Sequence, residues 1–366
     1  MKVALITIHR VMNYGTVLQA FATQELIKNM GCQVEIVDYI TEVRKLKDIF
    51  LWYPTAFSDS KIKQAMYITS RFPANILKYI TFNRFIKRNY QLTQKQYYTI
   101  SDLTQDPPKA DVYIVGSDQV WNSKYNQMID RGFFLDFGDI NTKRISFASS
   151  FGVSELDKNE FFETKRLLSK FNSISVREDS GVKIINKMGY NAKLVLDPTL
   201  MLNKETWSKY IEEKKIKGRY VLLFLLYNED NGATEYARKI ADKMEIEVIQ
   251  LYWKPMKRPG VDKIAIYKSP FEFLRYVRDA EYVVTNSFHG TVFALNFNKQ
   301  FITVARNEFN SRLESILRLC NIERRYITKE FDVSEALRKI DYSSVNRILQ
   351  NEREKSMTYL KQALFE

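Results

Sequence analysis

The sequence runs Tyr282-Val283-Val284-Thr285-Asn286-Ser287-Phe288-His289-Gly290-Thr291-Val292-Phe293-Ala294-Leu295, from an apolar strand through a polar turn into a helix-like segment beginning at Gly290. In an α/β sheet such a turn lies at the carboxyl end of a strand, where ligands usually bind. The chain has only two histidines, so few of its side chains titrate near neutral pH without help. The other, His9, follows the first apolar strand in the same way. His289 is therefore the first candidate for acid–base chemistry, with Asn286, Ser287 and Gly290 beside it; a buried structural histidine is the alternative.

Apolar strands alternate with helical segments along both halves of the chain. In the first half we expect a helix at 16–30, ended by Gly31, and strands at 3–8, 33–37, 111–115, 144–148, 173–176 and 193–196. In the second half we expect strands at 220–226, 246–251, 281–285 and 301–304, with helices at 232–243, 270–279 and 290–297. This alternation predicts mostly parallel sheets with helices on both faces.

A chain of 366 residues favours two domains over one, and the stretch from Asp197-Pro198 to Asn203 interrupts the alternation. We therefore expect an N-terminal α/β domain at 1–200, with a helical, aromatic and basic insertion at about 41–105. A C-terminal α/β domain follows at 201–342, and a helix at 343–366 packs back on the N-terminal domain. The predicted fold class is α/β and GT-B-like, with two doubly wound Rossmann-type domains facing a central cleft.

The composition is that of a globular protein, with 45% hydrophobic and 14% aromatic residues. No apolar run reaches the length of a membrane span, and the start Met1-Lys2-Val3 reads as a buried strand without the features of a signal peptide. Two cysteines, Cys32 and Cys320, are too few and too far apart to suggest a disulfide framework or a zinc site. These features predict a cytoplasmic protein with reduced thiols and no bound metal.

The net charge of +13 favours acidic partners. Anionic lipid and a phosphorylated small substrate both fit, whereas no motif supports nucleic-acid binding. Basic and aromatic residues interleave along 71–88, which suits an amphipathic helix on the inner face of a membrane. A helix with a solvated basic face is the alternative.

Polar turns follow three strands of the first half. After the first strand, Asn13, Gly15 and Thr16 open a helix; Gly15 permits close backbone approach, and the helix start offers amides to an anion. This turn lacks both the G-x-G-x-x-G fingerprint and a Walker lysine, so it does not favour NAD or ATP.

In the second turn, Ser117, Asp118, Gln119 and Trp121 form a polar set around one aromatic ring. Asp118 and Gln119 suit sugar hydroxyls and Trp121 suits a sugar face; a capped turn with a core tryptophan is the alternative.

The third turn holds Arg177, which is well placed to bind a phosphate or carboxylate. A structural ion pair with Glu178 or Asp179 is the competing interpretation.

Taken in order, five motifs resemble the polysaccharide pyruvyl transferase family: Asn13-x-Gly15-Thr16, Gly116-Ser117-Asp118-Gln119-x-Trp121-Asn122, Ser175-Val176-Arg177-Glu178, Asp197-Pro198-Thr199 and Ser287-Phe288-His289-Gly290. The match spans about residues 1 to 320. The resemblance implies a GT-B-like fold and transfer of the enolpyruvyl unit of phosphoenolpyruvate, as co-substrate, to a sugar hydroxyl pair. The product is a pyruvate ketal on a cell-surface polysaccharide precursor, such as that of a capsule or exopolysaccharide. It also implies that His289 is the general acid and that Arg177 binds phosphoenolpyruvate.

One departure bears on the donor. Many members of the family have Arg-Leu-His where this chain has Ser287-Phe288-His289. Backbone amides near Gly290, or the cations of Arg306 or Lys299, are candidates to replace the missing arginine. The acceptor is expected to be a saccharide, which a lipid diphosphate can carry. Two other functions remain open: a GT-B glycosyltransferase using a sugar nucleotide, and a non-catalytic glycan- or membrane-binding protein.

Overall fold

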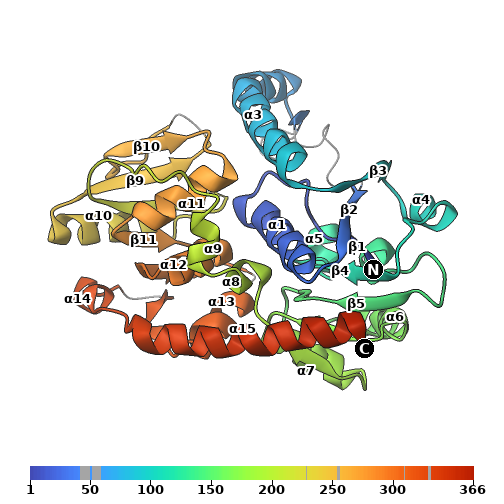
Figure 1. Ribbon diagram of the computed structural model, residues 1–366. Helices are drawn as coiled ribbons and strands as arrows, with labels where there is room; N and C mark the ends of the chain where they lie inside the picture. Colours follow the sequence, from blue (N-terminus) through green and yellow to red (C-terminus); the bar gives the residue numbers. More distant parts are fainter. Residues whose placement is uncertain (42–49, 52–58, 228, 254–255, 309, 329–330) are drawn as a thin grey trace.

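Two parallel sheets, each with helices on both faces, organise the molecule (Figure 1). The computed structural model describes residues 1–41, 50–51, 59–227, 229–253, 256–308, 310–328 and 331–366. The first sheet has the order β3-β2-β1-β4-β5, formed by Leu92–Tyr97, Gln33–Tyr39, Lys2–Ile6, Val112–Val115 and Lys143–Ser146. Its central strands β1 and β4 are apolar runs because helices cover both faces. A separate pair, β6 (Ile174–Val176) and β7 (Ala192–Leu194), adjoins β5 through isolated bridges.

The second sheet has the order β10-β9-β8-β11-β12-β13, formed by Lys263–Ile266, Glu247–Tyr252, Tyr220–Phe224, Tyr282–Thr285, Gln300–Val304 and Tyr326–Ile327. In both sheets the chain first moves outward from a central strand and then returns to its other side. This reversal falls between β1 and β4 in the first sheet and between β8 and β11 in the second. Ligands of open α/β sheets bind at such points, outside the carboxyl ends of the strands. The turns after β1, β4 and β11 are those in which the sequence analysis found its polar motifs.

The helices surround these sheets: α1 Tyr14–Asn29, α3 Lys61–Asn89, α4 Ile100–Gln105, α5 Ser123–Asn126, α6 Lys158–Leu168, α7 Asp179–Lys187, α8 Pro198–Met201, α9 Lys204–Ser208, α10 Ala233–Met244, α11 Pro270–Asp279, α12 Phe288–Asn296, α13 Ser311–Leu319, α14 Val333–Leu337 and α15 Tyr342–Phe365. The proposed boundary near residue 200 falls in the connection between β7 and β8. Helix α15 runs along the bottom of both halves in Figure 1. Its Tyr359 hydroxyl donates to the Ser146 carbonyl in β5 at 2.9 Å, and its Ser356 hydroxyl accepts from the Leu196 amide at 2.9 Å.

Helix α1 joins the two halves through an apolar contact. The Tyr14 ring stacks on Phe273 of α11, with centroids 4.7 Å apart and planes 5° from parallel. The Tyr14 hydroxyl donates to the Lys268 carbonyl at 2.8 Å. One buried cluster includes residues of α1, α11 and α12. The start of α1 is thereby held beside the start of α12, which carries His289.

The prediction of a mainly helical insertion at 41–105 is wrong in part. Helices α3 and α4 lie within it, but Leu92–Tyr97 forms β3, an edge strand paired with β2. The sequence LTQKQY leaves most of its side chains exposed or half-buried, so it lacks the apolar run of a central strand. The edge strands β10 and β13 were missed for the same reason. Residues 42–49 and 52–58 of this segment lie outside the described residues.

Two boundaries near the site also differ from expectation. Strand β1 ends at Ile6 and not at residue 8, and α12 begins at Phe288 and not at 290. His289 is therefore on the first turn of the helix. No helix among the described residues has both the length and the apolar character needed to cross a bilayer.

Candidate active site

A narrow cavity, partly open to solvent, lies where the carboxyl ends of the two sheets face each other. Residues from both halves form its walls: Asn13, Thr16, Asp118, Gln119, Tyr125, Leu226, Tyr227, Asn286, Ser287, Phe288, His289, Arg306, Arg312 and Leu313. Of the predicted site residues, seven line it: Asn13, Thr16, Asp118, Gln119, Asn286, Ser287 and His289. Five do not: Gly15, Ser117, Trp121, Arg177 and Gly290.

His289 lines this cavity, and one of its ring nitrogens makes no hydrogen bond to a described residue. The residue is 6% exposed, and its Nε2 has no hydrogen-bond partner among the described residues. The nearest carboxylate, Oδ2 of Asp197, lies 3.9 Å from Nε2. Burial lowers the pKa of His289 to about 4, because desolvation outweighs the attraction of Asp197 and Asp118. The imidazole is therefore neutral at pH 7, with Nε2 not used in any hydrogen bond to a described residue.

Gly15 packs directly against this histidine. A Cβ on Gly15 would lie 1.9 Å from Nδ1 of His289, so only glycine fits there. The Asn13 side-chain oxygen accepts from the Gly15 amide at 2.9 Å and from the Thr16 amide at 3.5 Å. The expectation that these amides bind an anion is wrong, because the turn itself uses them.

The loop after β4 supplies a carboxylate that the first domain holds tightly. Asp118 accepts from the Thr16 hydroxyl at 2.7 Å and from the Gln119 amide at 2.9 Å. Its backbone has a φ of 76°, which non-glycine residues rarely adopt. Asp118 and Gln119 both face the cavity, as a sugar-binding role requires.

Trp121 does not serve as a platform for a sugar. It is 2% exposed and belongs to the core of the first domain. Its Nε1 donates to the Phe133 carbonyl at 3.0 Å, and its ring stacks on Phe134. The functional interpretation of Trp121 was wrong, because the ring is needed inside the core; the alternative of a core tryptophan is correct.

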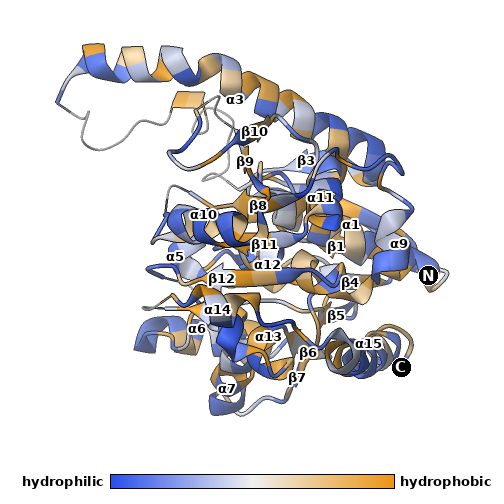
Figure 2. Ribbon diagram, turned by 90° about the vertical axis from the view of Figure 1, so that its left-hand side faces the viewer, coloured by the Kyte–Doolittle hydropathy of each residue, from blue (hydrophilic) through white to orange (hydrophobic). Residues whose placement is uncertain are grey.

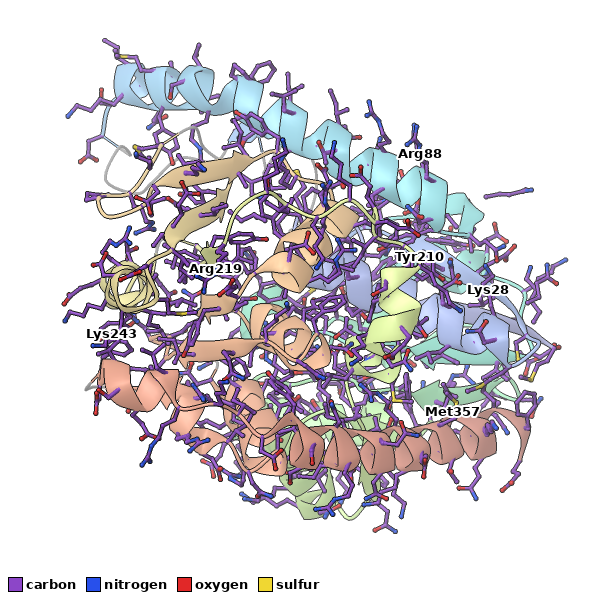
Figure 3. The ribbon with its side chains drawn as sticks, turned by 60° about the vertical axis from the view of Figure 1, so that its left-hand side comes forward. Lys28, Arg88, Tyr210, Arg219, Lys243 and Met357 are labelled. Atoms are coloured by element: carbon purple, nitrogen blue, oxygen red, sulfur yellow. The ribbon has the colours of Figure 1, made fainter. Side chains whose placement is uncertain are left out.

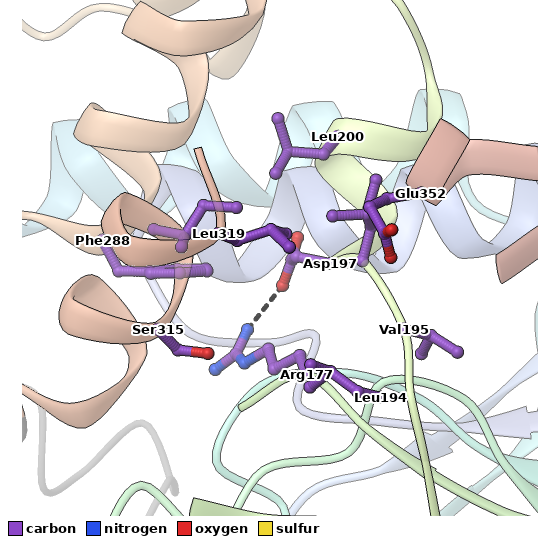
Figure 4. Close-up of a pocket in the computed structure, with 11 residues that line it drawn as sticks. Arg177, Leu194, Val195, Asp197, Leu200, Phe288, Ser315, Leu319 and Glu352 are labelled. Atoms are coloured by element: carbon purple, nitrogen blue, oxygen red, sulfur yellow. Dashed lines mark hydrogen bonds and ion pairs between the residues drawn. The ribbon is translucent and has the colours of Figure 1, made fainter. Parts of the chain in front are cut away.

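The guanidinium of Arg177 is paired with carboxylates, and Figure 4 shows its contact with Asp197. Its Nη1 lies 2.6 Å from Asp197 Oδ2 and 3.1 Å from the Ser117 hydroxyl, and its Nη2 lies 3.2 Å from Asp118 Oδ1. The Ser117 hydroxyl in turn donates to Asp197 at 2.9 Å. Burial alone would raise the pKa of Asp197, yet the charge of Arg177 and the hydrogen bonds from Thr199 hold it well below its usual range.

A structural ion pair with Glu178 or Asp179 was the competing interpretation of Arg177, and it is correct for Glu178, which lies 3.9 Å from Nε. Asp197 and Asp118 are closer partners, and Asp179 pairs with Arg318. The cluster ties the ends of β4 and β6 to the linker before α8.

The loop around His289 is fixed from within. Asn286 accepts from the Leu226 amide at 2.7 Å and donates to the Glu229 carbonyl at 2.8 Å, which joins it to the loop after β8. The Ser287 hydroxyl caps α12 by accepting from the Gly290 amide at 3.2 Å. The Gly290 amide is therefore not available to replace the missing family arginine.

The two cations suggested in its place lie at opposite edges of the sheet. Lys299 directly precedes β12, at the amino edge far from the cavity, so it is not a candidate. Arg306 follows the carboxyl end of β12 and lines the cavity. Its guanidinium is paired with Glu229 at 3.1 and 3.2 Å.

Sequence reasoning missed three residues of this region: Asp197, Tyr227 and Arg312. Asp197 lies in a quoted motif but was interpreted as a linker. Tyr227 and Arg312 belong to no motif and reach the cavity through the loop after β8 and the start of α13. Only the packing of the second domain places them, so no sequence signal identified them.

His9, the other strand-end histidine, is part of a closed polar cluster. It is 1% exposed, and its ring nitrogens lie 3.0 Å from the Thr7 carbonyl and 3.0 Å from Asp38 Oδ1. Arg10 pairs with the same Asp38 carboxylate. No group of three or more His, Cys, Asp or Glu side chains in the described part of the chain is arranged to hold a metal ion.

Comparisons with known proteins were made for the whole chain. A comparison with curated proteins gave no significant match. Among solved structures, the chain is similar to a UDP-GlcNAc 2-epimerase from Methanocaldococcus jannaschii, with a TM-score of 0.50 and 14% identity over 100% of this chain and 99% of that chain. It is also similar to a calicheamicin glycosyltransferase, with a TM-score of 0.45 and 13% identity over 99% of this chain and 96% of that chain. At such low sequence identity, the similarity shows only a shared fold. That fold is the predicted GT-B-like pair of Rossmann-type α/β domains.

The family comparison goes further. The model described as polysaccharide pyruvyl transferase matches residues 13–308, a span that begins at Asn13 of the first turn and includes His289 and Arg306. The five motifs and the meeting of their turns beside one cavity agree with that match. The chain thus belongs to the polysaccharide pyruvyl transferase family and is an enzyme of the transferase class.

Proposed function

We propose that this enzyme transfers the enolpyruvyl unit of phosphoenolpyruvate to two hydroxyls of a saccharide, forming a pyruvate ketal on a cell-surface polysaccharide precursor. The observation that carries this proposal is the buried, unpartnered Nε2 of His289 at the wall of a cavity between the domains. A proton donor for carbon must be held within reach of the substrate and shielded from bulk water.

His289 delivers a proton to the methylene carbon of phosphoenolpyruvate, which leaves cationic character on the carbon that bears phosphate. One sugar hydroxyl attacks this carbon, phosphate leaves, and the neighbouring hydroxyl closes the ketal. One hydroxyl proton restores His289, and the other leaves with phosphate. Of the described residues, these reaction steps use only side chains that give or accept a proton.

The donor also supplies the charge that this acid needs. Burial lowers the pKa of His289 to about 4, so it cannot act as a cationic acid at pH 7 without a nearby negative charge. Phosphoenolpyruvate carries a phosphate and a carboxylate, and negative charge within a few ångströms favours the protonated imidazole. Binding of phosphoenolpyruvate therefore favours the protonated form of His289, which can act as the acid.

The saccharide is expected on the side of the cavity lined by Asp118, Gln119 and Tyr227. Asp118 already accepts hydrogen bonds from Thr16 and Gln119, so it is rigid enough to position a hydroxyl. Carboxylate and amide groups next to an aromatic ring are suited to sugars, whose hydroxyls and ring faces need both kinds of contact.

A single assay compares the competing activities. The purified chain is incubated with a panel of saccharide acceptors and either phosphoenolpyruvate or sugar nucleotides. We expect acceptor-dependent phosphate release from phosphoenolpyruvate and a mass gain on the acceptor equal to one pyruvate ketal. Nucleotide release from a sugar nucleotide, without phosphate release, would instead support the glycosyltransferase. Binding of glycans without either release would support the non-catalytic function.

We further propose that the enzyme works in the cytoplasm and touches the inner face of the membrane through α3, where a lipid-linked acceptor would be found. Helix α3 carries basic but no acidic residues and stands at the edge of the molecule (Figures 2 and 3). Exposed apolar side chains recur along it at Ile62, Met66, Leu77 and Ile80, between 44% and 73% exposed. They are four, eleven and three residues apart, and each of these spacings is close to a whole number of helical turns, which places the four side chains on one face of the helix. This pattern is suited to an anionic interface.

Vesicle co-sedimentation tests this contact. Wild-type protein should bind vesicles of phosphatidylglycerol and phosphatidylcholine, and high salt should weaken the binding. The double substitution Met66→Glu/Leu77→Glu should abolish it, whereas Ile140→Glu, at an 84% exposed position elsewhere, should leave it unchanged. Equal binding by all three proteins would contradict the role of α3.

A further inference from the structure

Two arginines line the described part of the cavity, and they differ in how they are paired. Arg306 donates two hydrogen bonds to Glu229 and lies over the Tyr227 ring, 5.0 Å from its centroid. Arg312, on the first turn of α13, donates no hydrogen bond to any described residue, and its Nε is buried without a partner. The nearest carboxylate oxygen, Oδ1 of Asp118, lies 3.9 Å from its Nη1.

Both carboxylate oxygens of Asp118 already accept hydrogen bonds from residues other than Arg312. Its Oδ2 accepts from Thr16, and its Oδ1 accepts from the Gln119 amide and from Arg177. The N–H groups of the Arg312 guanidinium are therefore not used in hydrogen bonds to the described residues. The residue is only 6% exposed, so water cannot solvate its guanidinium fully. A buried cation without a partner is costly unless a ligand completes it.

The guanidinium of Arg312 is also oriented beside the candidate acid. It lies over the Phe288 ring, 5.5 Å from the centroid, and the Phe288 and His289 rings are 5.1 Å apart. Burial, with repulsion from Arg177, lowers the pKa of Arg312 to about 10, which leaves it charged at pH 7. The Arg177 guanidinium also lies near the Phe288 ring, 4.9 Å from the ring centroid. Unlike Arg312, Arg177 forms close ion pairs with Asp197 and Asp118.

We infer that Arg312 binds the phosphate or carboxylate of the donor, and that Arg177 is a positioning residue that holds Asp118 and Asp197. This inference rests on the proposed function for the identity of the donor. The anion-binding role itself follows from a buried arginine that makes no hydrogen bond to a described residue, has only a long ion pair with Asp118, and lines the same cavity as His289. Arg312 thus supplies a cation to a site in which position 287 is a serine.

Direct binding tests this inference without turnover. Phosphoenolpyruvate and, separately, inorganic phosphate are titrated calorimetrically into the full chain and into Arg312→Gln, Arg312→Lys and Arg318→Gln. Arg318 lies on the same helix, is 60% exposed and is remote from the cavity, so its substitution controls for loss of one charge. Loss of a charged hydrogen bond should weaken binding of both anions about 10- to 100-fold in Arg312→Gln. Arg318→Gln should bind as the wild type does.

The conservative variant separates contact from folding. Arg312→Lys keeps the charge but loses the two-pronged geometry, so it should bind phosphoenolpyruvate more weakly than wild type, whether or not Arg312→Gln folds. In turnover, Arg312→Lys should raise KM for phosphoenolpyruvate and leave KM for the acceptor unchanged.

Unchanged affinity for both anions in a folded Arg312 variant would overturn the inference and leave the proposed function intact. Wild-type protein that binds phosphate through Arg312 but not phosphoenolpyruvate would support the anion site and reject the donor. Wild-type protein that binds neither anion would reject both.

Discussion

The imidazole of His289 fills the space that a side chain at position 15 would need: a Cβ on Gly15 would lie 1.9 Å from its Nδ1. Gly15 lies on the first turn of α1 in the first half of the chain, and His289 lies on the first turn of α12 in the second. The two helix starts are pressed together by the apolar contact between α1 and α11. The candidate acid is thus positioned by backbone from the opposite domain, with no side chain between them.

Gly15→Ala should therefore lower turnover by displacing His289. The clash is with the ring of a buried side chain, and overpacking of this kind typically costs about 1–3 kcal/mol in the free energy of unfolding. We expect a folded protein with reduced kcat for phosphate release. Asn29→Ala, at the exposed end of the same helix, is the control and should retain full activity. Wild-type kcat in Gly15→Ala would show that the position of the ring is not critical.

His289→Gln should reduce kcat about 10²- to 10⁴-fold, the usual contribution of a positioned acid. The residue lines a cavity and its Nε2 bonds to nothing described, so the unfolding free energy should change little. Phosphate release measures the first quantity and urea denaturation the second. Undiminished turnover in the folded variant would eliminate the acid role, and failure to fold would favour a structural histidine.

Donor binding should be accompanied by proton uptake. The pKa of His289 is about 4 because burial disfavours the imidazolium, and an adjacent dianion should raise it. At any pH between the free and bound pKa values, binding therefore takes up a proton, and affinity for phosphoenolpyruvate rises as pH falls. Calorimetry in buffers of different ionisation enthalpy measures the uptake. His289→Gln should remove it; equal uptake in both proteins would assign the proton to another group.

Arg177→Ala should chiefly destabilise the fold. From the sequence we expected weaker donor binding, but the side chain is fully buried between Asp197 and Asp118. Its removal leaves two buried carboxylates without their cation, which typically costs about 3–5 kcal/mol. Arg166→Ala, which breaks an exposed pair with Glu163, should cost at most about 1 kcal/mol. A normally stable Arg177→Ala protein with a raised KM for phosphoenolpyruvate would restore the original interpretation.

The strand–helix alternation and the polar turns were readable in the sequence because each depends on a local pattern. Central strands such as Tyr220–Phe224 are buried on both faces and read as apolar runs. The turn with His289 was found because it directly follows such a run. The edge strand Leu92–Tyr97 was not found, because its side chains face solvent and leave no pattern.

The roles of single side chains were less predictable because they depend on neighbours distant in the sequence. Arg177 meets Asp197 and Asp118 across separations of 20 and 59 residues, so its ion pairs could not be deduced from spacing. Trp121 has the same sequence neighbours whether its ring faces the core or a sugar. Arg312 lies in no motif, and it reaches the cavity only because α13 packs beside α12.

The sequence by itself determined the α/β fold class, the family, and the set of turns that meet at the cavity. It could do so because periodicity and motif order are local properties of the chain. Only the tertiary structure decided which arginine is hydrogen-bonded to carboxylates and which is not, and that burial keeps His289 neutral at pH 7. These are properties of burial and of distances between charges, and both are set by how the two domains pack together.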